Sequence, residues 1–283
     1  MTREDLTHAS QACQTAHVVA DFYSQHPKLA LEWAQESNSI IILTVPDEKA
    51  LYAFCEKSGL DYTEFREPDL GYALTAVALH PCGEARKKTS NLPLAMKKEE
   101  HPDVKKNENK IKSMIRDMNE CEQMTGMSVL EHGWSVRNHV RDLIGERSKF
   151  NWKLPEWLPE KFEFDNFILD KYTIFHDCGK PNCRTEDESG QHFYNHAEVS
   201  SVVWSTISDD LEIKNLIKRD MEIHTISAAD LPDFCRDIDK AKLLCIVGLA
   251  ELHSNASMFG GIESQSFKVK YKQWSRRAKQ VFT

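Results

Sequence analysis

The 283-residue sequence lacks any long hydrophobic run. Its longest apolar segments, Ser39–Val45 and Leu243–Ala250, are much shorter than the ~20 residues that a membrane-spanning helix requires. The residues that follow Met1 are polar and charged, without the apolar region of a secretory signal. These absences argue against a membrane protein and predict a cytoplasmic location.

The sequence also lacks paired cysteines, because its eight cysteines include no Cys-x-x-Cys motif. Scattered cysteines in a cytoplasmic protein are most simply reduced residues of the core. Cys178 and Cys183 flank the histidine motif described below, where a thiolate would be an available metal ligand. We interpret both as structural, since free cysteine usually packs as a small hydrophobic residue.

Basic residues are in deficit. With 44 acidic and 36 basic side chains, the formal net charge is −8 at pH 7. This balance argues against a protein that coats nucleic acid through bulk charge, although it is compatible with a local basic patch. The hydrophobic content of 41% is sufficient for a core, and the length fits two domains at roughly 150 residues each.

Residues 1–85 predict a small α/β domain, because helical and strand patterns alternate along them. The β-branched run that ends at Val45 indicates a buried strand, and Asp47 is a suitable N-cap for the helix after it. In chain order the predicted elements are helix Ser10–Tyr23, strand Ser39–Val45, helix Asp47–Lys57 and strands Tyr62–Arg66 and Leu74–Leu79.

Residues 86–110 differ in composition, with two prolines, no aromatic residue and several Lys-Lys pairs. This pattern is typical of a solvated linker, and a basic nucleic-acid-binding tether is the alternative. From residue 111 to 283 the apolar spacing is helical and indicates no strand. The predicted helices are Ile111–Gln123, Val129–Ile144, Phe164–Phe175, Ala197–Ile207, Leu211–Ile223, Leu231–Val247 and Lys268–Val281. The predicted fold class is therefore α+β with two domains, the second of them all-α.

The hexapeptide His176-Asp177-Cys178-Gly179-Lys180-Pro181 places an imidazole and a carboxylate at adjacent positions. Divalent metals bind this mixture of nitrogen and oxygen ligands, and two-metal sites hydrolyse phosphoesters. Further candidate ligands lie near predicted helix ends, where a rigid backbone can hold converging side chains. They are His132, His196, His224 and Glu251. Together these residues predict one buried metal site assembled from several helices.

The pattern resembles the HD-domain phosphohydrolase superfamily from about Met127 to the C-terminus. The matching segments are Leu130-Glu131-His132, Phe175-His176-Asp177-Cys178-Gly179-Lys180-Pro181, Asn195-His196-Ala197-Glu198, Ile223-His224 and Ala250-Glu251-Leu252-His253. The resemblance implies a helical, metal-dependent phosphatase or phosphodiesterase. It also implies that His132, His176 and Asp177 hold the primary metal.

The resemblance extends to a second metal, for which His196 and His224 occupy the positions of the ligands. The family's last ligand is usually an Asp on a late helix, and here Glu251 is the best-placed acid, with His253 as the alternative. The implied cofactor is one or two divalent ions of Mn, Fe, Ni, Co or Mg.

Such a site implies a mechanism in which Asp177 bridges two ions that activate a water molecule for attack on phosphorus. Lys180 either pairs with a substrate phosphate as a point charge or is a solvated turn lysine. The segment from Gln191 to His196 looks like HD domains of tRNA-processing and RNA-repair enzymes. That likeness implies RNA ends or a nucleotide as the substrate.

The N-terminal segment resembles the archaeal/eukaryotic-type peptidyl-tRNA hydrolases over about Thr2–Pro81. The matching segments are Arg3-Glu4-Asp5-Leu6, Gln11-Ala12-Cys13-Gln14-Thr15-Ala16-His17, Phe65-Arg66-Glu67-Pro68-Asp69-Leu70 and Leu74-Thr75-Ala76-Val77-Ala78-Leu79. By resemblance, His17, Asp69 (or Glu67) and Thr75 would lie in the cleft that cuts the ester between a peptide and tRNA.

Two features of that family pattern are missing. The family has a lysine in a Gly-Lys turn before the helix, whereas Thr7-His8-Ala9-Ser10 contains none. The family also has a hydrophobic strand before R-x-D-L, and a sheet without that strand would expose an edge. The missing lysine weakens the prediction of ester hydrolysis and leaves tRNA recognition in place. For His17 the alternative to a catalytic role is a buried helix histidine.

The sequence therefore favours a metal-dependent phosphohydrolase that acts on RNA ends or a nucleotide, with a tRNA-directed N-terminal domain. One alternative is a peptidyl-tRNA hydrolase with an accessory HD domain. Another is a non-catalytic protein that binds tRNA or a nucleotide. The pattern indicates no membrane partner, and it leaves open the metal, its number, the true substrate and the oligomeric state.

Overall fold

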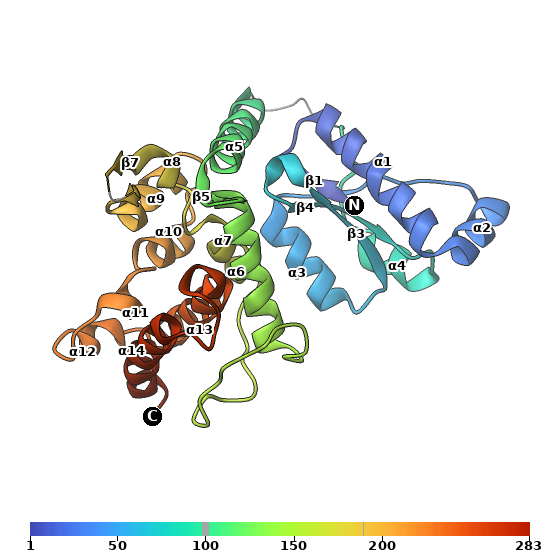
Figure 1. Cartoon of the computed structure of the whole chain (residues 1–283). Coiled ribbons are helices and arrows are strands. Elements are labelled where there is room, and N and C mark those ends of the chain that lie inside the picture. The colour runs from blue at the N-terminus through green and yellow to red at the C-terminus, as the bar shows by residue number, and fades with distance from the viewer. Residues whose placement is uncertain (98–101, 189) are drawn as a thin grey trace. The chain divides into compact units, whose positions relative to one another are not determined.

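The computed structural model divides the chain into two compact units, Met1–Ser113 and Met114–Thr283 (Figure 1). The described residues are 1–97, 102–188 and 190–283. Both units combine helices with small sheets, so the α+β class is confirmed. Among the described residues, no helix is long and apolar enough to cross a membrane.

A four-stranded sheet in the order β2-β1-β4-β3 forms the centre of the N-terminal unit. Its strands are β1 (Thr2–Arg3), β2 (Thr44–Val45), β3 (Tyr62–Glu67) and β4 (Ala73–Leu79). Strand β1 runs parallel to β2 and antiparallel to β4, and β3 pairs antiparallel with β4. Helices α1 (His8–Gln25) and α3 (Glu48–Ser58) pack on the sheet and confirm the two predicted helices (Figure 1).

Two strand predictions need correction. Only Thr44–Val45 of the predicted strand Ser39–Val45 pairs in the sheet, and Ile40 and Ile41 before it are 54% and 66% exposed. The second is the strand β1, which was not predicted; it includes Arg3 of the R-x-D-L motif and lies between β2 and β4. A two-residue strand is too short to produce a hydrophobic pattern, so it cannot be recognised from the sequence.

The R-x-D-L motif has a structural explanation in the side chain of Arg3. Its guanidinium donates hydrogen bonds of 2.8 and 2.6 Å to the carboxylate of Asp5 and one of 3.1 Å to Glu48. Burial alone lowers the pKa of Arg3, but these two carboxylates outweigh it and hold the pKa above its usual value. Charge-assisted pairs of this kind are strong, and this one ties β1 to α3.

The rest of the N-terminal unit is largely helical. It contains α2 (Pro27–Glu36), the 3-10 turn η1 (Pro68–Leu70), α4 (Gly83–Thr89) and the first part of α5 (Pro102–Glu120). Residues 86–110 therefore differ from the predicted solvated linker, since they include the end of α4, a bridge between Leu94 and Leu43, and the start of α5. Residues 98–101 of that segment lie outside the described residues.

The C-terminal unit is mainly helical. After α5 its helices are α6 (Val129–Ile144), α7 (Asn166–Phe175), α8 (Lys180–Cys183), α9 (His196–Trp204), α10 (Leu211–Lys218), α11 (Glu222–Thr225), α12 (Leu231–Phe234), α13 (Ile238–Ser254), the 3-10 turn η2 (Ala256–Phe259) and α14 (Gln265–Phe282). The predicted helices Leu211–Ile223 and Leu231–Val247 are each interrupted, the first at Arg219 and the second between Phe234 and Ile238.

The prediction of an all-α second domain is wrong in one respect, because the unit contains two hairpins. They are β5 (Glu122–Met124) with β6 (Met127–Ser128), and β7 (Arg184–Asp187) with β8 (Gly190–Phe193). These strands are two to four residues long and none of their residues is buried. Without an alternating apolar face they leave no strand signal in the sequence.

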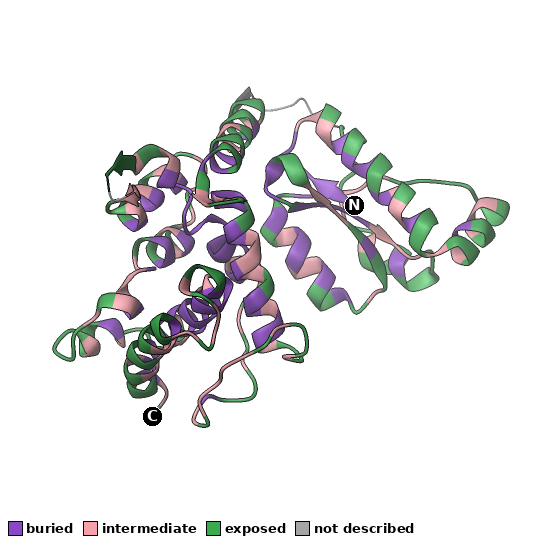
Figure 2. Ribbon diagram, viewed as in Figure 1, coloured by how far each residue is buried: buried purple, intermediate pink, exposed green. Residues whose placement is uncertain are grey.

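Helix α13 lies at the core of the C-terminal unit and packs against α6 and α14, while α6 also packs against α7. Figure 2 shows burial along most of α13, and all residues from Leu243 to Ala250 are buried. A helix that is apolar on all sides belongs inside a protein. This core fixes α6 and α7, the two helices that carry the metal-binding prediction.

Candidate metal centre

The first turn of α6 carries His132, and the end of α7 leads into His176 and Asp177. Helix α6 begins with a capping box in which the Ser128 hydroxyl accepts from the N–H of Glu131, and the Glu131 carboxylate accepts from the N–H of Ser128. Reciprocal capping satisfies two orphan donors at a helix start. It thereby fixes the turn on which His132 lies.

Two glycines allow the backbones to approach closely enough for these residues to meet. A Cβ atom on Gly133 would overlap the carbonyl oxygen of Ile174 on α7, and one on Gly179 would overlap the backbone N of Ser200 on α9. The Gly179 N–H donates a 2.9 Å hydrogen bond to the Ser200 hydroxyl. The close packing therefore holds the His-Asp turn between α6 and α9.

Substituting Gly133 with Ala should push α6 away from α7 and move His132 away from His176. Overpacking of this kind typically costs about 1–3 kcal/mol. We expect urea unfolding to show that loss, and metal titration of the folded variant to show weaker binding. Gly83→Ala is the control, because its Cβ would meet nothing within 4 Å. Unchanged stability and metal affinity in Gly133→Ala would contradict the role of this contact.

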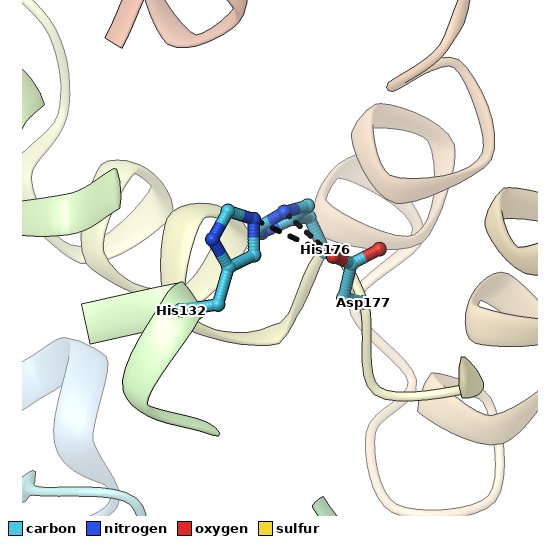
Figure 3. Close-up of side chains that lie close together, drawn as sticks. All are labelled: His132, His176 and Asp177. Atoms are coloured by element: carbon cyan, nitrogen blue, oxygen red, sulfur yellow. Dashed lines mark ion pairs between the residues drawn. The ribbon is translucent and has the colours of Figure 1, made fainter. Parts of the chain in front are cut away.

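The three residues form a compact buried group that could hold a metal ion (Figure 3). One ligand atom from each of His132, His176 and Asp177 lies within 4.8 Å of the others. Asp177 Oδ2 is 3.2 Å from His176 Nε2 and 3.7 Å from His132 Nε2. His132, His176 and Asp177 are at most 1% exposed.

Hydrogen bonding leaves the inward-facing atoms of this group without partners. Both ring nitrogens of His132, Nε2 of His176 and Oδ1 of Asp177 are buried and form no hydrogen bond to any residue that the structure describes. Nδ1 of His176 lies 2.8 Å from the Thr173 carbonyl, which orients the ring and leaves Nε2 free. Buried polar atoms rarely lack partners, so this donor set fits a divalent cation.

The electrostatics of the group suit metal ligation. Burial, with His176 next to it, lowers the pKa of His132 to about 4, so His132 is neutral and offers a lone pair. Burial also acts to lower the pKa of His176, but the carboxylates of Asp177, Asp220 and Glu251 outweigh it and raise the pKa to about 10. The carboxylates around His176 therefore favour positive charge at this ring, and a divalent cation bound there would be stabilised by the same carboxylates.

Lys180 is part of the centre and is 6% exposed. Its ammonium donates hydrogen bonds of 2.6 Å to Asp177 Oδ2 and 2.9 Å to Gln123 Oε1. The solvated turn lysine considered from the sequence is therefore wrong. His196 lies on the other side of the carboxylate, with Nε2 3.6 Å from Asp177 Oδ1 and 19% of its side chain exposed.

His224 and Glu251 form a separate pair, with Nε2 and Oε2 3.3 Å apart. Within the described residues, neither these two nor His196 joins the three-residue metal group. The pairing with His224 lowers the pKa of Glu251 to about 2 despite burial, which acts to raise it. The His253 ring packs against Trp152 and Phe267. The carboxylate of Glu251 acts to raise the pKa of both His132 and His176, so its charge acts on the centre.

Asp220 is a buried carboxylate, 3% exposed, that is absent from the residues predicted from the sequence. Its Oδ1 accepts a 2.5 Å hydrogen bond from the Tyr172 hydroxyl, and its Oδ2 is buried with no partner among the residues described. Its charge is one of those that raise the pKa of His176. The residue fell inside a predicted continuous helix, where an acidic side chain gives no signal of burial. The break at Arg219 places it inward.

In the N-terminal unit the predicted catalytic residues do not form a cluster. His17 is exposed, contrary to the buried alternative, and its ring stacks on Phe65 at 4.7 Å. Within the described residues it makes no hydrogen bond or ion pair, and Asp69 is also exposed. Thr75 is buried and donates a 3.2 Å hydrogen bond to Gln14, which in turn donates to Glu67. Glu67 and Thr75 therefore share a network that His17 and Asp69 do not enter.

The two cysteines of the His176-Asp177 segment, Cys178 and Cys183, form hydrogen bonds to backbone carbonyls. Cys178 is buried and donates to the Ser200 carbonyl at 3.3 Å, and burial raises the pKa of its thiol. Cys183 donates to the Lys180 carbonyl at 3.7 Å. In the described part of the chain, neither belongs to the metal group.

Comparison of the chain with family models, with curated proteins and with solved structures gives no match in any of the three. The two family resemblances therefore remain predictions from sequence. The geometry of the His132, His176 and Asp177 group carries the functional argument instead.

Proposed function

We propose that the chain is a metal-dependent phosphohydrolase whose primary ligands are His132, His176 and Asp177. The observation that carries this proposal is the burial of three convergent residues, each of which has at least one ligand atom without a hydrogen-bond partner among the described residues. Two imidazoles with one carboxylate suit Mn, Fe, Co or Ni, and they suit Mg less well because Mg prefers oxygen ligands. One group of three ligands supports one metal ion. A second ion would bind between Asp177 Oδ1 and His196.

A divalent ion held by these ligands would supply Lewis-acid polarisation of a phosphoryl oxygen and neutralise its charge. The side chains of the chain provide the rest. Asp177 remains ionised, because the positive charges of His176 and Lys180 hold its pKa well below the usual range against the effect of burial. The Lys180 ammonium donates to that carboxylate and to Gln123, which leaves one of its three protons available. That donor can bind a phosphate oxygen and orient the ester.

We propose RNA ends or a nucleotide as the substrate, and an RNA-directed role for the N-terminal unit. Support for the substrate comes from the likeness of the segment before His196 to HD domains of RNA-processing enzymes. An exposed imidazole stacked on Phe65 provides a flat surface of the kind on which nucleic-acid bases stack. The isolated position of His17 and the missing family lysine favour recognition over cleavage of peptidyl-tRNA.

Metal removal tests this function directly. Phosphatase and phosphodiesterase assays on the purified chain should show turnover that depends on Mn²⁺, Co²⁺ or Ni²⁺ and disappears with a chelator. His17→Ala should leave this turnover within about twofold, because His17 is exposed and, among the described residues, makes no hydrogen bond or ion pair. Metal-independent release of peptide from tRNA that is lost in His17→Ala would instead establish the peptidyl-tRNA hydrolase alternative. Tight RNA binding without turnover would establish the non-catalytic one.

A further inference from the structure

Helix α14 has an unusual charge distribution for a chain of net charge −8. Its 18 residues include six cations and no acidic residue. The cations are Lys268, Lys270, Lys272, Arg276, Arg277 and Lys279. A basic element in an acidic protein concentrates positive potential at one place on the surface, which favours an anionic ligand there.

One flank of α14 forms the wall of a cavity of about 190 Å³ that also contains the His224 and Glu251 pair. Lys270, Gln273 and Arg277 contribute this wall. Their spacing of three and four residues places them in one row along the helix. The cavity thus brings a row of polar and cationic side chains to the pair of His224 and Glu251, and the charge of Glu251 acts on His132 and His176 of the candidate metal centre.

The two cations of this row have no acidic partner within the described residues. Lys270 has only the ring of Phe259, with its Nζ 5.0 Å from the ring centroid. The Nε of Arg277 donates a 3.0 Å hydrogen bond to the Ile226 carbonyl and leaves the rest of the guanidinium available. By contrast, Lys268 on the same helix pairs with Glu263 at 2.9 Å.

Two further features of the cavity fit an anionic ligand with a polar body. The Oδ1 atom of Asn255 is buried in the lining and has no hydrogen-bond partner in the described part of the chain, so it can accept from a hydroxyl or amino group. The carboxylate of Glu251 would repel an anion, but the imidazole of His224 lies 3.3 Å from it and compensates its charge. The net charge of the lining is therefore positive at the α14 wall.

We propose that Lys270, Gln273 and Arg277 bind a second phosphate of the substrate while the scissile phosphate lies at Asp177. This inference deepens the proposed function and rests on it for the position of the scissile ester. The substrate class is then a phosphoester that carries at least one further phosphate. A nucleoside polyphosphate and a 5′-phosphorylated RNA end both have this chemistry.

A matched pair of double variants tests the inference. Lys270→Gln/Arg277→Gln removes the cations of the cavity wall. Lys272→Gln/Lys279→Gln removes the same charge from the opposite flank, about 160° around the helix. Each full-length protein, supplied with Mn²⁺, is compared in its binding to a phosphorothioate-linked 5′-phosphorylated oligoribonucleotide and to ADP. Hydrolysis of p-nitrophenyl phosphate, which has a single phosphate, is the third measurement.

The cavity variant is expected to bind one or both polyphosphate ligands about 10- to 100-fold more weakly, since hydrogen bonds between charged groups are lost. For the oligoribonucleotide the salt dependence should fall by about 1.4 in log–log slope, at about 0.7 per contact on single strands. The opposite-flank variant should bind within twofold of the wild type. Loss with ADP identifies a nucleoside polyphosphate, and loss with the oligoribonucleotide alone identifies an RNA end.

Equal losses in both double variants would overturn the inference, because they would reveal bulk attraction by α14 rather than a site. No loss in either variant would overturn it as well. Turnover of p-nitrophenyl phosphate separates this result from the proposed function. If the binding loss appears without any metal-dependent turnover, the phosphate site stands and the hydrolase proposal fails. If turnover requires Asp177 but the cavity variant binds normally, the hydrolase stands and the phosphate site fails.

Discussion

Replacing Asp177 with Asn is expected to lower metal-dependent turnover by on the order of 10³-fold, about 4 kcal/mol in the barrier. Asp177 is the residue that all the other groups of the centre share. Its Oδ2 lies near His132, His176 and Lys180, and its Oδ1 lies near His196. An amide keeps the shape of the side chain but removes the charge that a cation requires. Metal binding should therefore fall together with turnover.

Metal content after dialysis and kcat/KM on a phosphoester are the two measurements. Asp142→Asn is the matched control, because Asp142 is also buried and accepts hydrogen bonds from backbone N–H groups and from Trp152. That variant should lose stability but keep its metal. Full metal content and normal turnover in folded Asp177→Asn would refute the assignment of this carboxylate.

The parts of the site that could be predicted from sequence are those carried by regular helices. Helix α6 has the predicted bounds, and α7 ends at the predicted residue, because apolar side chains recur there at helical spacing. The helical spacing of the sequence therefore predicts that His132, His176 and Asp177 lie near helix ends. Their convergence is confirmed as a group that could hold a metal ion.

The contacts that bring these helices together could not be predicted from the same pattern. In the sequence, Gly133 is only a weak helix former inside α6. In the structure, the lack of a Cβ atom at Gly133 allows the backbone of α7 to approach closely. Gln123 holds the Lys180 ammonium from a hairpin too short and too polar to be recognised. Apolar spacing predicts one continuous helix over Leu211–Ile223. In the structure this helix breaks at Arg219, and Asp220 is buried just after the break.

The N-terminal unit shows the opposite case, where a motif was recognised but its residues serve the fold. Arg3, which is buried, forms an ion pair with the exposed Asp5 of R-x-D-L at the start of the sheet. The hydroxyl of Thr75 donates a hydrogen bond to Gln14. A motif records which residues occur together, and it does not distinguish a shared structural network from a shared reaction.

Lys180→Met is expected to destabilise the metal-free protein by about 3–5 kcal/mol, the typical result of removing one partner from a buried ion pair. The ammonium is the group nearest to the Asp177 carboxylate, at 2.6 Å, and its loss leaves both that charge and Gln123 Oε1 without their donor. Methionine preserves most of the side-chain volume, so the change in the free energy of unfolding reflects the lost charge and not lost packing. Added metal should restore part of the loss, because a cation at His132, His176 and Asp177 compensates the same carboxylate.

Urea unfolding with and without Mn²⁺ measures both parts of this expectation. Lys218→Met is the control, because Lys218 is half-exposed and its pair with Glu198 at 3.1 Å is a surface pair worth about 1 kcal/mol or less. Both proteins are measured at one metal concentration, 100 times the Kd of the wild type. Binding to the folded state alone then adds about 2.7 kcal/mol to the free energy of unfolding of the wild type. A larger gain in Lys180→Met than in the wild type would show that lysine and metal compensate the same charge. Equal gains would mean that Lys180 and the metal act independently, and the ammonium would then be free to serve a substrate phosphate even while the metal is bound.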